Sequence, residues 1–272
     1  MEIYTLNVGQ GQFVVITGDT QAIIVDTYVP LNPGTDIVNV KAALAKILQG
    51  KNLVGLIVTG FDADHFNEIG LKIILNKYRP NWIMYPKYFK PTGNAKTCFS
   101  VIEGFEQQNK FMRVSVLLDD DNSRFYETLS KEFTFEIFSP HSSDMNSSNN
   151  CSLVCKVRET STRATYLITG DTENDRWESI VYYFGTYLKS DVLDAPHHGS
   201  KNGISRDAIS RIAPHTVLIS AGVGNQYGHP DAEATRLFNA HAKEYYQTNS
   251  SGGQSIRTAV TNAGVKSFKF QP

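Results

Sequence analysis

The chain has 272 residues, 41% of them hydrophobic, and its 26 lysines and arginines against 27 aspartates and glutamates give a formal net charge of −1. This length and composition allow one large hydrophobic core or two modest ones, and they exclude a largely disordered chain. The near-neutral charge excludes a chain-wide basic field for nucleic-acid backbones, so any phosphate binding must come from a local site.

The first ten residues, MEIYTLNVGQ, are acidic and strand-like and lack the basic flank and apolar stretch of a signal peptide. No apolar run approaches the length of a membrane span. Three cysteines, Cys98, Cys151 and Cys155, are an odd number that argues against a disulfide framework. We therefore expect a cytoplasmic protein without a membrane portion, and we expect Cys151 and Cys155 to serve packing rather than metal binding.

The chain opens with a predicted antiparallel meander of three short runs rich in valine and isoleucine, separated by turns that contain glycine. These runs cover residues 2–8, 13–17 and 22–26. Residues 38–48 then show the apolar spacing of a helix, and residues 53–59 form a continuous apolar run typical of a strand buried on both faces. That run ends at the acidic segment TGFDADHFNEIG.

The rest of the chain continues to alternate between strands and helices. Predicted strands cover residues 81–86, 113–118, 133–138, 151–157, 164–169, 191–196, 216–220, 244–248 and 267–270. Predicted helices cover residues 68–78, 94–110 and 173–184, the last with Thr172 as N-cap, and two more lie near Arg206 and at 232–241. The polar segment 141–150 is expected to be a loop.

Polar side chains that suit metal binding follow several of these predicted strands. They are Asp62, Asp64, His65, Asp171, His197, His198 and, within NQYGHP, His229. Carboxylate and imidazole ligands together favour a cation such as zinc, manganese or iron. Without a cation, three gathered aspartates would repel one another and raise one another's pKa.

Taken singly, most of these residues have a simpler interpretation. Asp64 and Asp171 are each placed where a side chain caps a following helix, and His229 alone is an ordinary loop histidine. The pair His197 and His198 is harder to explain by packing, because two imidazoles before Gly-Ser add little to a core. The order and spacing of the whole set favour a functional site.

Seven blocks occur in a recognisable order: LNVGQG, AIIVDT, VTGFDADH, NNCSLV, LITGD, VLDAPHHGSK and GNQYGHP. In these blocks the chain resembles the metallo-β-lactamase superfamily, and within it the hydrolase domain of the DNA-internalisation competence protein ComEC and its stand-alone relatives. The resemblance covers nearly the whole chain. It implies a single α/β domain over residues 1–272, folded as an αββα sandwich with metals at the sheet edges.

The resemblance also assigns metal ligands. The family's HxDxDH segment falls on residues 60–65, where Gly60 stands in place of the first histidine. The resemblance implies that Asp62 serves one metal position, that Asp64 and His65 serve the other, and that Asp171 bridges the two. The first metal motif is therefore degenerate.

The two histidine blocks complete the implied site. The resemblance implies that one histidine of the HH pair is a metal ligand, and we assign this role to His198. It places His229 beside the substrate, as donor to a phosphate or leaving group. We assign catalytic roles to Asp64, His197 and His229.

Further positions depart from the family pattern. Gln12 and Phe66 replace an aspartate and a glycine, and we expect them to narrow or block the mouth of the site. His141 and Asn150 lie where the superfamily has a further ligand, although we expect His141 to be exposed. Asp26 is expected to orient a ligand or form a turn, not to bind metal.

The position built from Asp64, His65, Asp171 and His198 retains four ligands, enough for one cation, and one or two zinc or manganese ions are expected. We therefore predict a metal-dependent hydrolase, a phosphodiesterase or nuclease that acts through a metal-bound hydroxide on a nucleic acid or nucleotide. Two alternatives to this prediction stay open. One is a hydrolase of another bond, such as a lactone or thioester. The other is a degenerate member of the superfamily that binds a protein partner without turnover.

Overall fold

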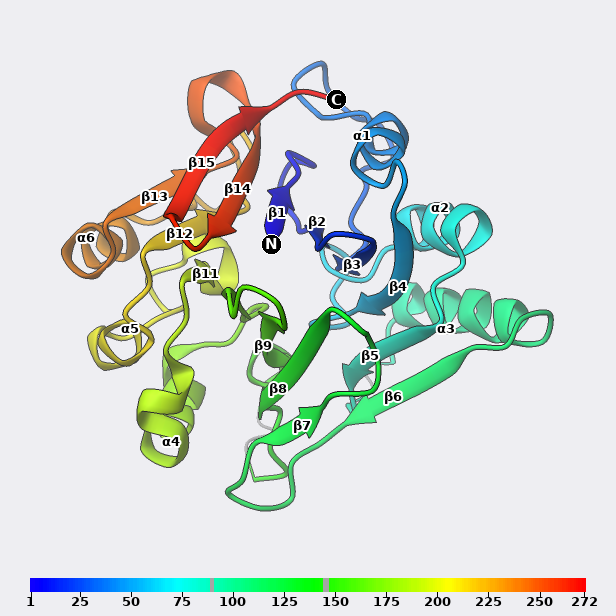
Figure 1. Ribbon diagram of the computed structural model, residues 1–272. Helices are drawn as coiled ribbons and strands as arrows, with labels where there is room; N and C mark the ends of the chain where they lie inside the picture. Colours follow the sequence, from blue (N-terminus) through cyan, green and yellow to red (C-terminus); the bar gives the residue numbers. More distant parts are fainter. Residues whose placement is uncertain (89–90, 144–146) are drawn as a thin grey trace.

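The structure is a computed structural model that describes residues 1–88, 91–143 and 147–272. Two β-sheets face each other, and helices cover the outer face of each, so four layers form an αββα sandwich (Figure 1). In sheet order, the first sheet holds β15 (Gly264–Phe270), β14 (Ser255–Thr261), β1 (Glu2–Thr5), β2 (Val14–Thr17), β3 (Gln21–Val25), β4 (Asn52–Ile57), β5 (Trp82–Pro86) and β6 (Met112–Val116).

The second sheet holds β13 (Glu244–Gln247), β12 (Thr216–Ile219), β11 (Val192–Asp194), β10 (Thr165–Ile168), β9 (Val154–Glu159), β8 (Phe133–Ser139) and β7 (Arg124–Tyr126). The first sheet is covered by α1 (Val40–Ile47), α2 (Glu68–Tyr78) and α3 (Gly93–Glu106). The second is covered by α4 (Asn174–Phe184), α5 (Arg206–Ile212) and α6 (Ala232–His241). Short 3₁₀ turns are η1 (Asn149–Cys151), η2 (Gly185–Leu188), η3 (Pro196–Gly199) and η4 (Ser250–Gly252).

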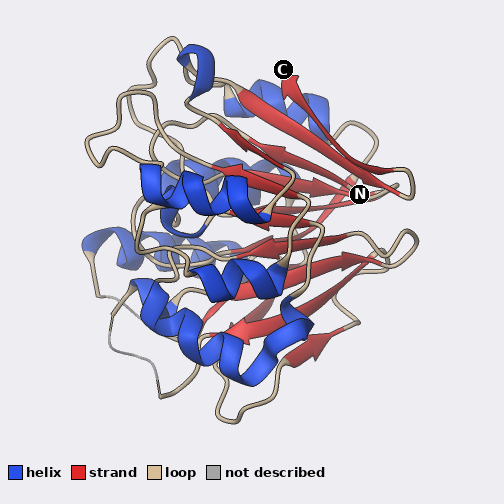
Figure 2. Cartoon of the chain, turned by 90° about the vertical axis from the view of Figure 1, so that its left-hand side faces the viewer, coloured by secondary structure: helices blue, strands red, loops and turns tan. Residues whose placement is uncertain are grey.

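Each sheet combines an antiparallel part with a parallel part. Strands β3 to β6 run parallel in the first sheet, and β10 to β13 run parallel in the second. The carboxyl ends of parallel strands meet at one edge, where the loops that follow them gather. Figure 2 shows long loops collected at the side of the sandwich away from the N-terminus. This edge is where the sequence places its candidate metal-binding residues.

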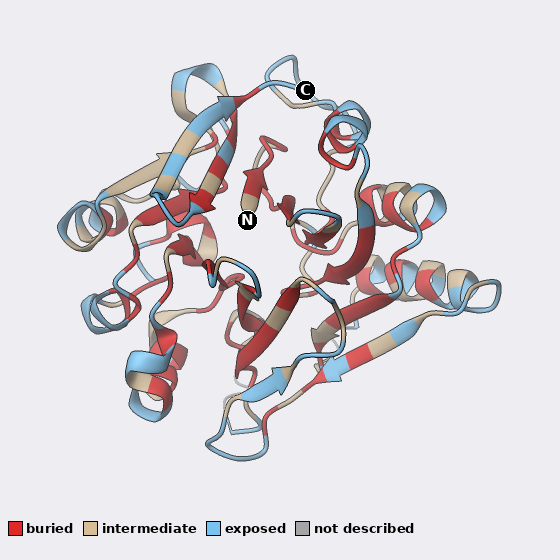
Figure 3. Ribbon diagram, in the orientation of Figure 1, coloured by how far each residue is buried: buried red, intermediate tan, exposed pale blue. Residues whose placement is uncertain are grey.

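The core has three parts, which follow from the alternation of side chains along the strands. Both sheets contribute residues such as Ile23 and Tyr166 to the layer between them, and this layer is fully buried. Apolar faces of the helices cover the outer sides, with Leu44 on α1 and Trp177 on α4 as examples. Figure 3 shows buried strands and exposed outer faces of the helices, the pattern expected of amphipathic helices on a sheet.

The ends of the described chain join the same sheet. Strand β1 pairs antiparallel with both β2 and β14, so that Glu2 lies opposite Thr17 on one side and Ala259 on the other. The first sheet is therefore completed only by residues more than 250 positions from its first strand. None of the helices within the described residues combines the length and apolar character that a membrane span requires.

The opening meander, the helices and the parallel strands agree with the sequence analysis. Strands β7 and β14 were not predicted: β7 is short and mostly exposed, whereas β14 carries an alternating burial pattern that the sequence does contain. Thr172 is not the N-cap of α4, because its hydroxyl donates to the Thr169 carbonyl and Glu173 takes the cap position. In the predicted loop 141–150, residues 144–146 lie outside the described residues.

The cysteines agree with a packing role. Cys98, Cys151 and Cys155 are all free thiols and all buried. Burial raises the pKa of Cys98 to about 12 and that of Cys151 to about 11. These thiols are therefore protonated at neutral pH, and the candidate metal cluster contains none of them.

Candidate metal centre

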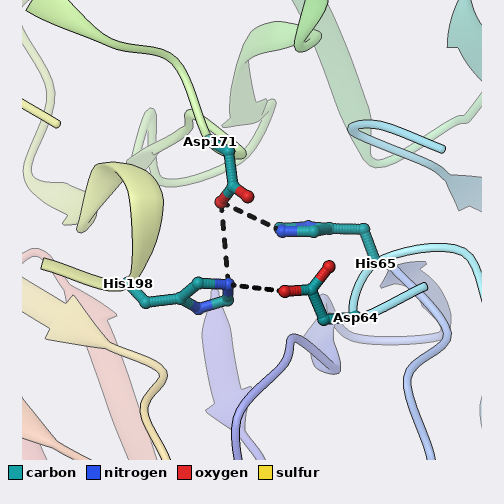
Figure 4. Close-up of side chains that lie close together, drawn as sticks. All are labelled: Asp64, His65, Asp171 and His198. Carbon is teal, nitrogen blue, oxygen red and sulfur yellow. Dashed lines mark ion pairs between the residues drawn. The ribbon is translucent and has the colours of Figure 1, made fainter. Parts of the chain in front are cut away.

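Four side chains from three segments converge at one point. Asp64, His65, Asp171 and His198 each offer one ligand atom, and these atoms all lie within 4.8 Å of one another. In Figure 4, Oδ1 of Asp171 lies 3.0 Å from Nε2 of His65 and 3.6 Å from Nε2 of His198. Nε2 of His198 is also 3.6 Å from Oδ2 of Asp64. These are the four residues of the metal position that the sequence predicted to be intact.

The first pair of ligands comes from the turn that joins β4 to α2. The turn closes on itself, because the His65 amide donates to the Asp62 carbonyl at 3.0 Å. It is also tied to neighbouring loops: the Gln12 amide donates to the Asp64 carbonyl and the Thr27 amide to the His65 carbonyl, both at 2.8 Å. Backbone hydrogen bonds on both sides thus fix where the two side chains begin.

Asp171 and His198 come from turns that follow β10 and β11. Gly170 has a φ of +51°, and a Cβ there would lie 2.9 Å from Thr59, so this turn requires glycine. His197 and His198 have φ of 50° and 55°, a left-handed conformation that costs roughly 1–3 kcal/mol at a non-glycine residue. The His197 amide donates to the Gly170 carbonyl at 2.9 Å and links the two turns.

The second nitrogen of each clustered imidazole is held by a protein acceptor. Nδ1 of His65 lies 2.7 Å from Oδ2 of Asp26, which is fully buried and also accepts from the amide and hydroxyl of Thr59. Nδ1 of His198 lies 2.8 Å from the Ser220 carbonyl. Because Nδ1–H is donated in both cases, each ring presents an Nε2 lone pair to the cluster. Asp26 has the orienting position that the sequence predicted.

The donor set fits a divalent cation. Nε2 of His65, Oδ1 of Asp171 and Nε2 of His198 are buried and have no hydrogen-bond partner among the described residues, although they lie close together. Unsatisfied buried polar atoms cost roughly 1–3 kcal/mol each, and a shared cation would satisfy all three. Two imidazole nitrogens and two carboxylates are ligands that zinc, manganese and iron accept.

The charges within the cluster also favour the binding of a cation. Burial alone would raise the pKa of Asp171, but the charges of His65 and His198 outweigh it and hold this pKa below the ordinary value. Burial alone would lower the pKa of His65, but Asp171 and Asp26 outweigh it and raise this pKa well above the ordinary value. The carboxylates thus attract positive charge to this point, which a proton or a cation can supply.

The cluster opens into a pocket of about 560 Å³. Its lining combines predicted site residues with polar residues of the surrounding loops: Gln10, Tyr28, Asp62, Ala63, Asp64, Ser148, Asn149, Asp171, His197, His198, Gln226, Tyr227 and His229. The rings of His197 and His229 lie edge to face with centroids 5.8 Å apart, and Tyr227 stacks on His229 at 5.8 Å. Two imidazoles thus line the pocket beside the cluster.

Sequence reasoning did not identify Tyr28, Asn149 or Tyr227 as part of this pocket. Tyr227 had a usable signal, since it stands in the same YGHP block as His229. Tyr28 directly follows the AIIVDT block and Asn149 opens the NNCSLV block, but neither block shows that these side chains reach the pocket, which depends on the fold. Burial and the charge of Asp64 raise the pKa of Tyr28, so its hydroxyl stays protonated at neutral pH.

Asp62 lines the pocket but lies outside the four-residue cluster. The expectation that Gln12 and Phe66 narrow the mouth is wrong. Gln12 is 3% exposed and donates through Nε2 to the Asp194 carboxylate at 2.5 Å, and Phe66 is 1% exposed in the core. Gln12 and Phe66, the two departures from the family pattern, are therefore buried below the pocket and do not obstruct its opening.

Neither residue considered for the missing ligand lines the pocket. His141 is half-buried, not exposed as expected, and its Nδ1 lies 2.6 Å from the Ser143 hydroxyl. Asn150 is buried, and its Oδ1 accepts from the Glu173 amide at the start of α4. Both side chains are therefore engaged in local structure.

No family model matches the chain. Among curated proteins, the chain is 29% identical to ComE operon protein 3 of Bacillus subtilis over 208 residues, which make up 74% of this chain and 24% of that protein. The chain spans between 17% and 32% of the length of the curated relatives that it matches. It therefore corresponds to one part of these larger proteins.

The solved structures that match over most of the chain include the following two. The structure of CmlA, a diiron beta-hydroxylase from Streptomyces venezuelae, has a TM-score of 0.54 at 13% identity and covers 98% of this chain and 54% of CmlA. Unliganded yeast PDE1 has a TM-score of 0.55 at 11% identity, with 90% of this chain and 97% of PDE1 covered. The chain has the metallo-β-lactamase fold. The resemblance stated from the sequence motifs is thereby confirmed.

Within the metallo-β-lactamase fold, the cluster lies at the edge where the loops of both sheets meet, as the motifs predicted. CmlA, one of the two neighbours, is a diiron protein. At 11–13% identity these neighbours establish the fold alone. The activity must be argued from the residues of this chain.

Proposed function

We propose that this chain is a metal-dependent hydrolase that cleaves phosphodiester bonds in a nucleic acid or nucleotide. The observation that carries the proposal is the four-ligand cluster in a 560 Å³ pocket, whose buried Nε2 and Oδ1 atoms lack hydrogen-bond partners among the described residues. Zinc and manganese are the proposed cations, because both accept mixed nitrogen and oxygen ligands. When bound, such a cation acts as a Lewis acid and lowers the pKa of water.

Asp64, His65, Asp171 and His198 hold the cation in this proposal. Asp64 is the most exposed of the four, with a third of its side chain accessible from the pocket side. Burial would raise the pKa of Asp64, but the nearby imidazoles of His198 and His65 outweigh it and lower this pKa, so the carboxylate stays ionised. An ionised Asp64 at the pocket surface is placed to accept a proton during the reaction.

His197 and His229 are proposed to act on the phosphate. Burial and the nearby charge of His197 lower the pKa of His229 despite Asp231, so this imidazole is neutral at pH 7. A neutral imidazole still donates one N–H, and His229 is therefore a hydrogen-bond donor to a phosphoryl or leaving oxygen. Nδ1 of His197 lies 3.3 Å from Glu173, which leaves Nε2 for the substrate side.

Gly60 bears on how strong the activity is. A second cation beside Asp62 would lack the imidazole that the family motif places at position 60. One cation suffices to activate water, but two cations also clamp the attacking and leaving oxygens of a phosphodiester. We therefore propose slow turnover of unactivated esters and faster turnover of activated ones.

The test measures metal content and cleavage together. Purified protein is supplemented with zinc or manganese, its metal content is determined, and cleavage of single-stranded DNA, RNA and cyclic nucleotides is compared with that by Asp171→Ala. The proposal expects about one metal per chain and cleavage that Asp171→Ala abolishes. Cleavage unchanged by this substitution would overturn it.

The same measurement, extended to lactone and thioester substrates, separates the alternatives. A chain that retains no metal favours the binding role, in which the fold serves a protein partner. A chain that retains metal but cleaves only lactones or thioesters favours a hydrolase of another bond, since one cation polarises any of these groups.

A further inference from the structure

A second concave site lies on the outer face of the second sheet, away from the metal centre. It is a groove of about 570 Å³, which we call the outer groove. Strands β7 to β10 and the turn η2 with its following residues line it: Phe125, Glu127, Thr134, Glu136, Lys156, Arg158, Arg163, Thr165, Thr186, Tyr187, Lys189, Ser190 and Asp191. It shares no residue with the pocket over the metal cluster.

The pleat of the sheet explains why these residues form one surface. Arg158 lies opposite Thr134 of β8 and Thr165 of β10, and in the next row Lys156 lies opposite Glu136 of β8. Alternate residues of a strand point to the same face, so these side chains share the outer face while Cys155 and Val157 enter the core. Helix α4 covers one end of this face, and the groove is the part beyond it.

The floor of the outer groove is a buried ion pair. Lys156 is 3% exposed, and its Nζ lies 2.9 Å from Oε2 of Glu136. The same ammonium donates to the Tyr187 carbonyl and lies 5.1 Å from the centroid of the Phe138 ring. These contacts join β8, β9 and η2, so the groove has a rigid, internally neutralised base.

Cations predominate above that floor. The lining has four basic and three acidic side chains. The ion pair between Lys156 and Glu136 neutralises one of each, which leaves three basic and two acidic side chains. Oδ2 of Asp191 accepts from the amide and hydroxyl of Thr165, at 2.8 and 2.7 Å.

By contrast, three cationic side chains have no hydrogen-bond or ion-pair partner among the described residues. They are Arg158, Arg163 and Lys189. Three unpaired cations around one concavity form a local site for anionic groups on a chain whose net charge is −1.

Aromatic rings flank these cations. Phe125 is 59% exposed on β7, which Figure 3 shows as an exposed edge strand, and Tyr187 is 70% exposed in η2. The neighbouring Phe184 of α4 is buried in the core, whereas Tyr182 is 82% exposed. Large exposed rings beside unpaired cations suit a ligand that has both phosphates and flat bases.

We propose that the outer groove binds the phosphate and base of a nucleotide unit, as a free nucleotide or as part of a single-stranded nucleic acid. Arg158, Arg163 and Lys189 contact phosphate oxygens, with the arginines offering paired N–H donors. Phe125 and Tyr187 offer faces on which bases stack. This site is separate from the proposed catalytic pocket: Thr165, at the start of β10, lines the groove, whereas Asp171 follows the end of that strand.

Binding is measured without divalent metal, so its outcome does not depend on the proposed hydrolase activity. In chelator-treated buffer, the probes are ATP and a fluorescein-labelled oligothymidylate of about 12 nucleotides, within the site sizes of single-strand binders. The test variant is Arg163→Glu with Lys189→Glu, both exposed. The matched control is Lys266→Glu with Lys269→Glu, which makes the same charge change on the exposed lysines of β15.

The proposal expects the test variant to bind oligothymidylate at least about tenfold more weakly than wild type and the control variant to bind it within about twofold. The slope of log K against log salt should fall by about 1.4, since each lost phosphate contact removes about 0.7 for a single strand. Tyr187→Ala and Phe125→Ala should weaken binding without changing that slope. Equal affinity of both double variants would overturn the proposal, as would the absence of any binding to wild type.

Two further outcomes identify the ligand. Binding of ATP as tight as that of oligothymidylate assigns the groove to free nucleotides, and binding of oligothymidylate alone assigns it to a strand. Polyglutamate and unlabelled oligothymidylate are then compared as competitors at equal total charge. If polyglutamate competes as strongly as oligothymidylate, the groove selects for negative charge only. That result would overturn the role of the bases and favour an acidic peptide.

Discussion

Nδ1 of His65 lies 2.7 Å from Oδ2 of Asp26, and both side chains are buried. Asp26 itself has a φ of 58°, a conformation that is uncommon for a residue other than glycine. The carboxylate fixes the ring so that Nε2 faces Asp171, 3.0 Å away. A residue outside the four-residue cluster thus determines how one candidate ligand presents its Nε2 atom.

Asp26→Asn is expected to weaken metal affinity by about 10- to 100-fold, because the amide orients His65 less strongly and lowers its basicity. Isothermal titration with zinc or manganese measures the affinity. Asp207→Asn, which changes an exposed aspartate on α5, is the control. Equal affinities of wild type and Asp26→Asn would contradict an orienting role for Asp26.

Metal should stabilise the folded chain. At a free concentration about 100 times the Kd, a cation that binds only the folded state adds about 2.7 kcal/mol to the free energy of unfolding. His198→Ala removes a ligand and should abolish this gain, which thermal or urea unfolding with and without metal measures. His241→Ala, outside the cluster, should keep the gain; a gain that persists in His198→Ala would exclude this site as its source.

Gly60→His should restore the ligand that the first metal motif lacks. Gly60 does not have a left-handed backbone, and a Cβ there would meet only Ser152 Oγ at 3.9 Å, so the substitution begins without a clash. We expect the metal content to rise from about one to about two per chain, with faster cleavage of unactivated phosphodiesters. Gly60→Ala adds the Cβ without the imidazole and should change neither. Unchanged metal content in Gly60→His would mean that Asp62 and Asp171 do not form a second position.

The buried Asp194 predicts a pH dependence of stability. Burial raises the pKa of Asp194 to about 7, despite the hydrogen bond from Gln12. Because the folded chain keeps this proton while the unfolded chain loses it near pH 3.9, the stability contributed by Asp194 is present below about pH 3.9 and is lost as the pH rises to about 7.

Asp194→Asn removes the titrating carboxyl, so the free energy of unfolding should decline less as the pH rises. The difference between wild type and variant across this range is at most about 4 kcal/mol, at 1.36 kcal/mol per unit of pKa. Urea unfolding of metal-free protein at several pH values measures it. Parallel curves for the two proteins would show that the carboxyl of Asp194 titrates normally.

The αββα fold class followed from the resemblance of seven sequence blocks to the metallo-β-lactamase superfamily. The sequence predicted the opening meander and most later strands and helices, because continuous apolar runs, glycine turns and helical spacing are local patterns that burial imposes. It also placed Asp64, His65, Asp171 and His198 at strand ends, where ligand motifs are recognisable from a few adjacent residues. Strand β14 was missed although its alternation is present, and β7 was missed because three residues, two of them exposed, carry almost no pattern.

The tertiary structure shows which residues meet. It selected His198 over His197 for the cluster, since consecutive residues in left-handed turns point in different directions. It buried Gln12 and Phe66, which the sequence had placed at the mouth, and it added Tyr28 and Tyr227 to the pocket. The contact of Gln12 with Asp194 joins residues 182 positions apart in the chain, and no local pattern records a distance that the packing of two sheets sets.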